Sequence, residues 1–406
     1  MKLEQYTAKQ KKILIACIVA YTAAYVCRTN LTPALSDIQD TFGVTAARVG
    51  LLPTLFCIPY ALGQIFTGYL ADRFRALTLM LTGLLGSALI NILFAVAPSL
   101  EMLMVLWCLN GVFQSMIWTP IVRIFAVNYT GAVRDHALFM LSFTMIAGYL
   151  IAWALSGLLT SHVGWRVAFA ISGLVTIAMA VPSCCALRSS GNTVFSETTE
   201  KEAKPAMMPM GQLFRTTDLL NVLLLCLFNG YVRDSIMNWA PKMLSDTQNI
   251  DLSSALAVIL IIPIVNYLGI TFGKLVFRKT GAHASKAMFC LVLLESLFSL
   301  ILFLFFNVST VVCAGLIALC SAMAYGLNPL ITSLKPMEYE HTGRVALVAG
   351  LLDATIYAGS AFSGTFVGYL RDQIGWSAVF ASWAVFSFFS AMVILPTLRK
   401  RSNLRK

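Results

Sequence analysis

The sequence predicts an all-α membrane protein of twelve transmembrane helices, arranged as two pseudo-symmetric six-helix bundles. Composition is the first reason, because the 406 residues are 58% hydrophobic and only 12% charged, whereas a soluble domain carries about 25% charged residues. Secondly, apolar runs recur along the whole chain, each close to the roughly 20 residues needed to cross a hydrocarbon core. Thirdly, the second half of the chain repeats motifs of the first half.

The apolar runs are continuous, which favours helices over the ten-residue alternation of a membrane barrel. The first half predicts spans at residues 13–35, 47–70, 76–96, 101–125, 137–160 and 165–187. The second half predicts spans at residues 219–243, 253–277, 284–306, 309–333, 344–369 and 376–397. The first run follows a polar start and is too long for a cleaved signal, so we expect it to remain as the first helix.

The positive charges predict the orientation of these helices. With the N-terminus inside, most of the 29 Lys and Arg residues fall in cytoplasmic segments, and the predicted outer segments hold only Arg48, Arg166, Lys242 and Arg371. This is the positive-inside bias, and it explains the net charge of +11 without a nucleic-acid partner. We therefore expect a multi-pass protein of the plasma membrane, a bacterial inner membrane, with both termini in the cytoplasm and the lipid bilayer as its surroundings.

The sequence carries no pattern of an enzyme or a metal protein. All ten cysteines lie within or beside apolar runs, as small buried side chains do. The four histidines are scattered near the predicted membrane surfaces, at positions 136, 162, 283 and 341. A Gly-rich phosphate loop and a nucleophile elbow are both missing from the sequence. We therefore expect no catalytic residues, no metal site and no cofactor.

An internal repeat divides the chain. GYLADRF, residues 68–74, is matched by GKLVFRK, residues 273–279, a separation of 205 residues. GLLTSHVGW, residues 157–165, is similarly matched by GYLRDQIGW, residues 368–376. The repeat predicts an N-terminal bundle at residues 1–187 and a C-terminal bundle at residues 218–406. The polar stretch 188–217 between them is expected to be a cytoplasmic linker.

Two arginines lie inside predicted spans and share the repeat separation: Arg28 in the first and Arg233 in the seventh. A charge at the centre of a membrane helix costs about 2.5–3.5 kcal/mol on insertion scales. Paired guanidinium groups would suit phosphate or carboxylate oxygens. Alternatively, Asp234 or Asp353 neutralises an arginine inside the protein. Adjacent helical residues point about 100° apart, so we expect poor geometry for an Arg233–Asp234 pair.

The motif GYLADRFRA after the second span resembles the signature of the major facilitator superfamily. The resemblance implies two six-helix bundles with a substrate site near the midplane between them, and alternating access by rocking. It also implies cytoplasmic contacts that control gating, with Arg123 as a partner for Asp72. The second copy of the motif has Phe277 in place of the acid. We therefore expect the cytoplasmic gating contact there to be weaker, or to use Glu338 or Glu340 instead. The implied gating residues are Gly68, Asp72, Arg73, Arg75, Arg123, Gly273 and Arg278.

A narrower resemblance lies at the arginines. YTAAYVCRTN and GYVRDSIMNWAPKML resemble the first and seventh spans of the organophosphate:phosphate antiporters, and residues 109–123 and 342–370 resemble the fourth and eleventh. The resemblance implies that Arg28 and Arg233 grip the phosphate of a small anion. It implies hydroxyl donors at Tyr21, Tyr25 and Tyr357. Two unpaired cations would repel each other and hold the two halves apart until an anion binds. An empty carrier would then switch slowly, so that one anion is exchanged for another. We expect a monomer with no obligate protein partner.

The chain departs from that family at its cationic positions. Thr29 and Gln64 stand where glycerol-phosphate members have lysines, and Thr144 stands near a histidine position. The chain adds an acid, Asp353, which predicts either proton coupling or a packing role. Gln64 and Asp353 therefore join the candidate substrate site. Besides exchange of a phosphorylated metabolite for phosphate, the alternatives are a proton-coupled symporter of a carboxylate or sugar acid, and a transporter-like membrane sensor.

Overall fold

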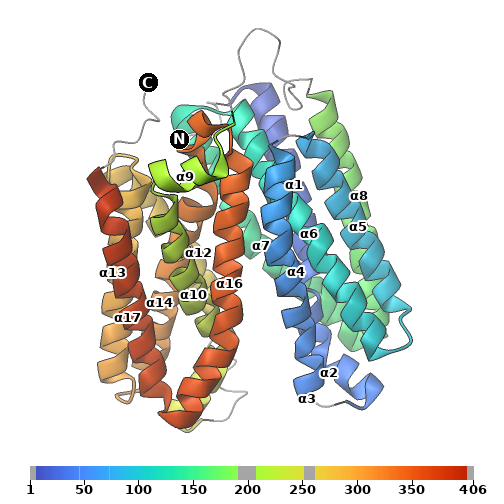
Figure 1. The fold of residues 1–406 in the computed structure, drawn as a ribbon. Coiled ribbons are helices and arrows are strands. Elements are labelled where there is room, and N and C mark those ends of the chain that lie inside the picture. Colours follow the sequence, from blue (N-terminus) through green and yellow to red (C-terminus); the bar gives the residue numbers. More distant parts are fainter. Residues whose placement is uncertain (1–5, 45, 73, 191–206, 251–260, 400–406) are drawn as a thin grey trace. The chain divides into compact units, whose positions relative to one another are not determined.

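A computed structural model describes residues 6–44, 46–72, 74–190, 207–250 and 261–399 of the chain (Figure 1). Among these residues, 11 helices are long and apolar enough to cross a membrane. The predicted eighth span, 253–277, falls partly on residues outside the described part. Its described portion is helix α12, Ile262–Lys279. The spans therefore agree with the predicted twelve-helix class, and the chain is a multi-pass membrane protein.

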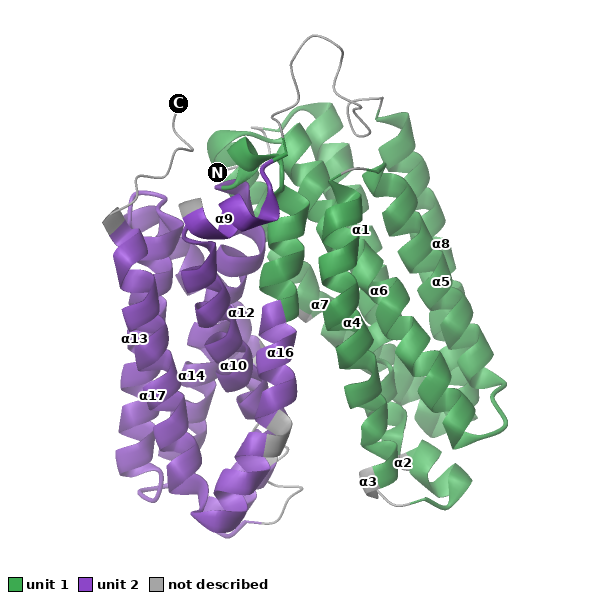
Figure 2. Cartoon of the chain, in the orientation of Figure 1, with its two compact units in different colours: residues 1–207, 339–354 green, residues 208–338, 355–406 purple. Residues whose placement is uncertain are grey.

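The chain forms two compact units, which Figure 2 shows in green and purple. The first unit contains residues 1–207 together with residues 339–354. Its helices are α1 (Ala8–Thr29), α2 (Leu31–Phe42), α3 (Ala46–Val49), α4 (Leu51–Ala71), α5 (Ala76–Ala95), α6 (Leu100–Asn128), α7 (Gly131–Val163) and α8 (Trp165–Ser189). It also takes in the 3₁₀ turn η4 (Glu340–Thr342) and the start of α16 (Val345–Gln373).

Helix α1 begins at a capping box and carries the first candidate residue close to its end. The Thr7 hydroxyl accepts a hydrogen bond from the Gln10 backbone N–H, and the Gln10 side chain accepts one from the Thr7 N–H. These two bonds satisfy N–H groups that the first helical turn leaves without partners. At the other end Asn30 keeps right-handed helical angles, so α2 follows α1 almost without interruption.

Close helix approaches hold the first unit together. A Cβ atom built on Gly111 of α6 would lie 2.4 Å from the Phe56 carbonyl oxygen of α4. Only glycine allows the two backbones to come so near, as small residues do throughout membrane bundles. Farther along, Phe94 and Phe169 stack with ring centroids 4.3 Å apart, which packs α5 against α8.

The second unit contains residues 208–338 and 355–406. Its described elements are α9 (Met210–Thr216), α10 (Leu219–Gln248), α12, α13 (Ala284–Phe305), α14 (Thr310–Pro329), the π-helical turn η3 (Leu330–Leu334), α15 (Lys335–Met337), the rest of α16, α17 (Trp376–Ile394) and the 3₁₀ turn η5 (Leu395–Arg399). Helices α12 and α14 approach closely, because a Cβ on Gly269 would lie 2.2 Å from the Ala322 carbonyl oxygen. Helix α9 falls in the predicted linker, of which residues 191–206 lie outside the described part.

Candidate functional site

Arg28 lies among aromatic rings of α1 and α4. Its guanidinium carbon is 4.4 Å from the ring centroid of Tyr60, 5.3 Å from that of Phe56 and 5.7 Å from that of Tyr25. A guanidinium over aromatic faces gains about 0.5–2 kcal/mol from the ring quadrupoles, more where water is excluded. The rings therefore stabilise a positive charge in this half-buried position.

Asp353 of α16 belongs to the same unit and lies beside this group. Its Oδ2 atom accepts a hydrogen bond from the Tyr60 hydroxyl at 3.1 Å and another from the Gln64 amide at 2.9 Å. Tyr60 thus contacts Arg28 with its ring and Asp353 with its hydroxyl. Close approach of the two helices makes this possible, since a Cβ on Gly350 would lie 2.2 Å from the Gln64 carbonyl oxygen.

The remaining first-unit candidates extend the aromatic group. Tyr21 and Tyr25 meet edge to face with centroids 5.2 Å apart, and Tyr21 lies 5.0 Å from Trp118 of α6. The structure therefore brings Arg28, Tyr21, Tyr25, Gln64 and Asp353 together in one unit. Sequence reasoning missed Tyr60, although its position four residues before Gln64 places both on one face of a helix.

Two positions that are basic in the family are occupied here by threonines that bond to their own helices. The Thr29 hydroxyl donates to the Tyr25 carbonyl oxygen at 3.0 Å, and the Thr144 hydroxyl donates to the Leu141 carbonyl oxygen. A hydroxyl satisfied by the preceding helical turn supplies no positive charge. Neither Thr29 nor Thr144 therefore contributes a positive charge to the first unit.

Arg233 of α10 forms a two-point ion pair with its neighbour. Its Nε lies 2.8 Å from Asp234 Oδ1 and its Nη2 lies 3.1 Å from Oδ2. Nη1 also donates to Asn328 Oδ1 at 3.2 Å, and the Ser360 hydroxyl donates to Asp234. The expectation of poor geometry for this pair is wrong. The flexible arginine chain folds back over the adjacent carboxylate, so the 100° separation of the Cβ directions does not prevent the pair.

The second unit also holds Tyr357, a half-buried residue of α16. Arg233 is itself 8% exposed, and the carboxylate of its partner Asp234 is partly buried. A buried guanidinium needs such a partner, because desolvation of an isolated charge is costly. Arg28 in the first unit and Arg233 in the second unit thus have different neighbours, aromatic rings for Arg28 and a carboxylate and an amide for Arg233.

Asp72, directly after α4, contacts the start of α16 within the first unit. Its Oδ1 accepts from Arg123 at 3.0 Å and from the Ala346 N–H at 3.1 Å, and its Oδ2 accepts from the Leu347 N–H at 2.9 Å. These are first-turn N–H groups, where a carboxylate is stabilised by the helix dipole. Burial raises the pKa of Asp72 above its usual value, although the Leu347 N–H, Arg123 and the Ala346 N–H lower it.

Other motif residues surround this contact. A Cβ on Gly68 would lie 2.7 Å from the Ala346 carbonyl oxygen, so this glycine lets α4 and α16 meet. Arg123 is the partner that the sequence suggested for Asp72. Arg75 is exposed at the N-cap of α5, and Arg73 lies outside the described residues.

The second copy of the motif has different neighbours. A Cβ on Gly273 would lie 2.4 Å from the Gly326 carbonyl oxygen, and Arg278 is exposed near the end of α12. Glu338, one of the two acids expected to serve here, pairs with Lys335 at 2.6 Å. Glu340, the other, pairs with Arg134 of the first unit at 2.7 Å.

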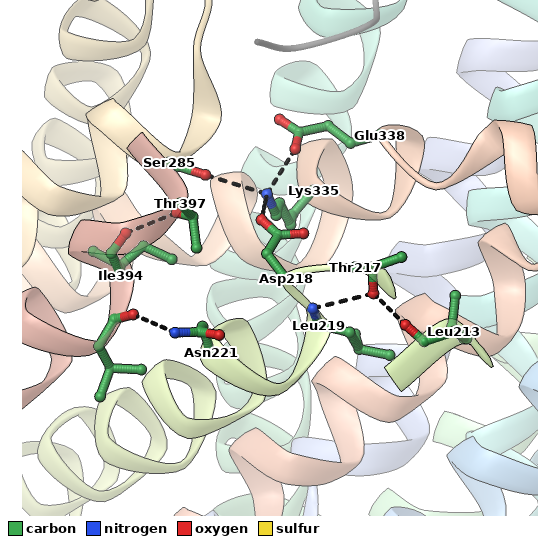
Figure 3. A network of polar contacts seen from close by, with 11 residues as sticks. Leu213, Thr217, Asp218, Leu219, Asn221, Ser285, Lys335, Glu338, Ile394 and Thr397 are labelled. Atoms are coloured by element: carbon green, nitrogen blue, oxygen red, sulfur yellow. Dashed lines mark hydrogen bonds and ion pairs between the residues drawn. The ribbon is translucent and has the colours of Figure 1, made fainter. Parts of the chain in front are cut away.

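Lys335 is the buried centre of a polar network at one end of the second unit (Figure 3). Its ammonium donates to Asp218 at 2.7 Å, to Glu338 at 2.6 Å and to Ser285 at 3.2 Å, and the residue is 1% exposed. The network joins the starts of α10 and α13 to α15. From sequence, Lys335 was only one of many cytoplasmic charges, because nothing local marks its burial.

The comparisons with known proteins agree with this architecture. The family model of the Major Facilitator Superfamily matches residues 17–350. The membrane sensor protein UhpC of Salmonella typhimurium is 25% identical, over 98% of this chain and 93% of the sensor. A probable hexose phosphate transport protein of Chlamydia muridarum is 22% identical, over 99% and 94%. The crystal structure of the transporter FucP superposes with a TM-score of 0.79 at 13% identity, covering 96% and 99%.

These relatives are consistent with the organophosphate:phosphate antiporter resemblance of the first and seventh spans. The matched region includes Arg28, the motif at Gly68–Asp72 and Arg233. The helical spans, the superposed fold and the family match lead to one conclusion: the chain belongs to the major facilitator superfamily.

Proposed function

We propose that this protein is a secondary transporter that moves a small phosphorylated metabolite across the membrane in exchange for phosphate. The observation that carries the proposal is the setting of Arg28, a guanidinium held inside a membrane helix bundle by Tyr25, Phe56 and Tyr60. The name of the hexose phosphate relative supports the substrate class. We place the protein in a bacterial inner membrane as a monomer with both termini in the cytoplasm.

In this proposal Arg28 and Arg233 each donate to the anion, and Tyr21, Tyr25 and Tyr357 supply hydroxyl donors. A guanidinium presents several N–H groups in a planar fork, which suits phosphate oxygens. Gln64 and Asp353 would contact the polar organic part. Transport would then proceed by alternating access of a site near the membrane midplane, with the Asp72 contact as a cytoplasmic gate.

The ion pair of Arg233 changes the physical basis of exchange. Two bare cations would favour an anion strongly, but Asp234 already occupies two N–H groups of Arg233. An incoming phosphate must compete with that carboxylate, so its net binding free energy is smaller than at a bare guanidinium. Moderate affinity suits a carrier, because the substrate must also leave.

Proteoliposomes test the exchange directly. Vesicles preloaded with inorganic phosphate should take up labelled glycerol 3-phosphate or hexose phosphate, and empty vesicles should not. Arg28→Lys and Arg233→Lys keep the charge but lose the fork, so both should lower uptake. Unchanged uptake in both variants would contradict the assigned roles of the arginines.

A proton-coupled symporter of a carboxylate or sugar acid is the second candidate. It is favoured by the position of Asp353, whose carboxylate accepts from Tyr60 and Gln64. In such a symporter this acid would carry the coupled proton. Uptake that ignores internal phosphate and follows an imposed pH gradient would establish this function in place of exchange.

A membrane sensor is the third candidate, favoured by the 25% identity to the sensor UhpC over nearly the whole chain. A sensor would use the same anion site without net transport. Purified protein that binds a sugar phosphate in a thermal-shift assay, but that moves no anion in proteoliposomes, would support the sensor and exclude the carrier.

A further inference from the structure

Side chains of α5 and α6 bond main-chain carbonyls of α1 in the turn just before Arg28. Gln114 donates to the Ala24 carbonyl oxygen at 2.9 Å. Asn110 and Asn91 both donate to the Cys27 carbonyl oxygen, at 2.9 Å and 3.1 Å. These donors come from two helices and converge on one turn of a third.

The donors are also bonded to one another. The Ser87 hydroxyl donates to Asn110 Oδ1 at 2.6 Å, and Gln114 donates to the Ser87 hydroxyl oxygen at 2.8 Å. The second N–H of Asn91 bonds the Ser87 carbonyl oxygen at 2.9 Å. We refer to Ser87, Asn91, Asn110 and Gln114 as the amide network. Each of its members is at most 2% exposed.

Such a network is costly in a membrane protein unless every group is paired. The two carbonyls differ in what the helix itself offers them. Cys27 lies in the last turn of α1, where carbonyls lack an N–H partner within the helix, so the two asparagines of the amide network supply its donors. Ala24 lies one turn earlier, where the helix supplies a donor of its own. In an α-helix the N–H of residue i bonds the carbonyl of residue i−4. The carbonyl of Ala24 is thus the one that the backbone N–H of Arg28 uses. Gln114 therefore binds the very peptide group that anchors Arg28.

The bonds limit both the rotation of α1 about its axis and its displacement along that axis at this turn. A small rotation of the helix would break the bonds from Asn110 and Gln114 together, and would swing the Arg28 side chain away from the rings of Phe56 and Tyr60. A group of this kind, which holds a binding residue from behind, controls affinity without touching the ligand.

We infer that the amide network is a positioning device for Arg28, so that Asn110 and Gln114 determine anion affinity through Arg28. The inference rests on the proposed function, in which Arg28 binds the anion. It assigns a role to residues that lie outside the proposed substrate contacts.

The test uses Asn110→Leu and Gln114→Met, which keep side-chain size and remove the donors. Binding of inorganic phosphate and glycerol 3-phosphate to the purified full-length protein is measured by calorimetry. We expect each variant to bind at least about tenfold more weakly, as happens when outer partners of metal ligands are removed. In an Arg28→Lys background the same substitutions should cause little further loss, because the residue that they position is already changed.

A structural role alone would lower stability without this coupling. The matched control is Asn221→Leu in the second unit, which removes a similar bond between helices, from Asn221 to the Val393 carbonyl oxygen at 2.8 Å (Figure 3). The control should lower the melting temperature and keep anion affinity. If Asn110→Leu does not fold, Gln114→Met carries the test.

Three outcomes would overturn the inference. If the network variants bind both anions as tightly as wild type, the inference is overturned, whereas the proposed function is not. The same loss in the Arg28→Lys background as in wild type would also overturn it, since the effect would not pass through Arg28. Wild-type protein that binds neither anion would overturn the proposed function, and the inference with it.

Discussion

Arg233 and Asp234 are neighbours in the sequence, and their side chains form a two-point ion pair with N···O distances of 2.8 and 3.1 Å. The pair occupies the guanidinium fork of one of the two arginines that mark this chain. An acid in this place acts as an internal competitor for any anion that Arg233 binds.

Asp234→Asn should therefore strengthen phosphate binding while it lowers stability. The substitution removes the competing charge, but it leaves a buried guanidinium with weaker partners, and breaking a buried pair costs about 3–5 kcal/mol. Calorimetry gives the affinity and thermal unfolding gives the stability. Weaker phosphate binding would contradict competition, and would show that Asp234 holds Arg233 in its binding orientation.

Tyr60 has two separable contacts, which two substitutions distinguish. Tyr60→Phe keeps the ring 4.4 Å from Arg28 and removes the hydroxyl donor to Asp353. We expect anion affinity to stay within about twofold, because the ring over Arg28 is kept, and the uptake rate to fall, because Asp353 loses a hydrogen-bond donor that holds it in place. Tyr60→Leu should also weaken anion binding, since it removes a cation–π contact of about 0.5–2 kcal/mol. Identical behaviour of the two variants would contradict this division.

Gly68→Ala should weaken the contact between α4 and α16. The new methyl group would lie 2.7 Å from the Ala346 carbonyl oxygen and 3.0 Å from the Leu347 Cα, both of them backbone atoms. Overpacking of this kind costs about 1–3 kcal/mol, so the melting temperature and the uptake rate should both fall. Gly211→Ala is the control, because nothing lies within 4 Å of the added atom. Equal effects of the two substitutions would contradict the close-approach explanation.

Asp72 should make stability depend on pH in a defined direction. Burial raises its pKa above 3.8 in the folded protein. A raised folded pKa means that the folded state binds the proton more tightly, so the contribution to stability is full below 3.8 and is lost as the pH rises through the folded pKa. Asp72→Asn cannot titrate. The stability of wild type relative to Asp72→Asn should thus fall as the pH rises from about 4, and a relative rise would refute the assignment.

Lys335→Gln should strongly destabilise the second unit. The substitution leaves Asp218 and Glu338 without the ammonium that neutralises both, and loss of one partner from a buried ion pair costs about 3–5 kcal/mol. Neutralising the acids as well, with Asp218→Asn and Glu338→Gln, should recover part of the melting temperature. Failure of this recovery would mean that packing around Lys335, rather than charge, holds these elements together.

The hydropathy of the sequence and its internal repeat were sufficient to predict the fold class. Each span is a local run of apolar residues, and the bilayer permits only helices for such runs. Eleven of the predicted spans correspond to described helices that are long and apolar enough to cross a membrane, and α12 is the described portion of the eighth. The pairing of Arg123 with Asp72 was also predicted from sequence, because the motif places Asp72 at the cytoplasmic face and Arg123 lies at the inner end of the fourth span.

The sequence by itself determined that this is a twelve-span membrane protein with two repeat-related arginines, because those properties depend on local composition and on spacing. Only the tertiary structure decided which groups meet those charges. It gave Arg233 the carboxylate of Asp234, and it placed Tyr60 against both Arg28 and Asp353. It also brought Asn110 to the turn before Arg28. Such contacts depend on helix rotation and side-chain conformation, and neither is encoded in hydropathy.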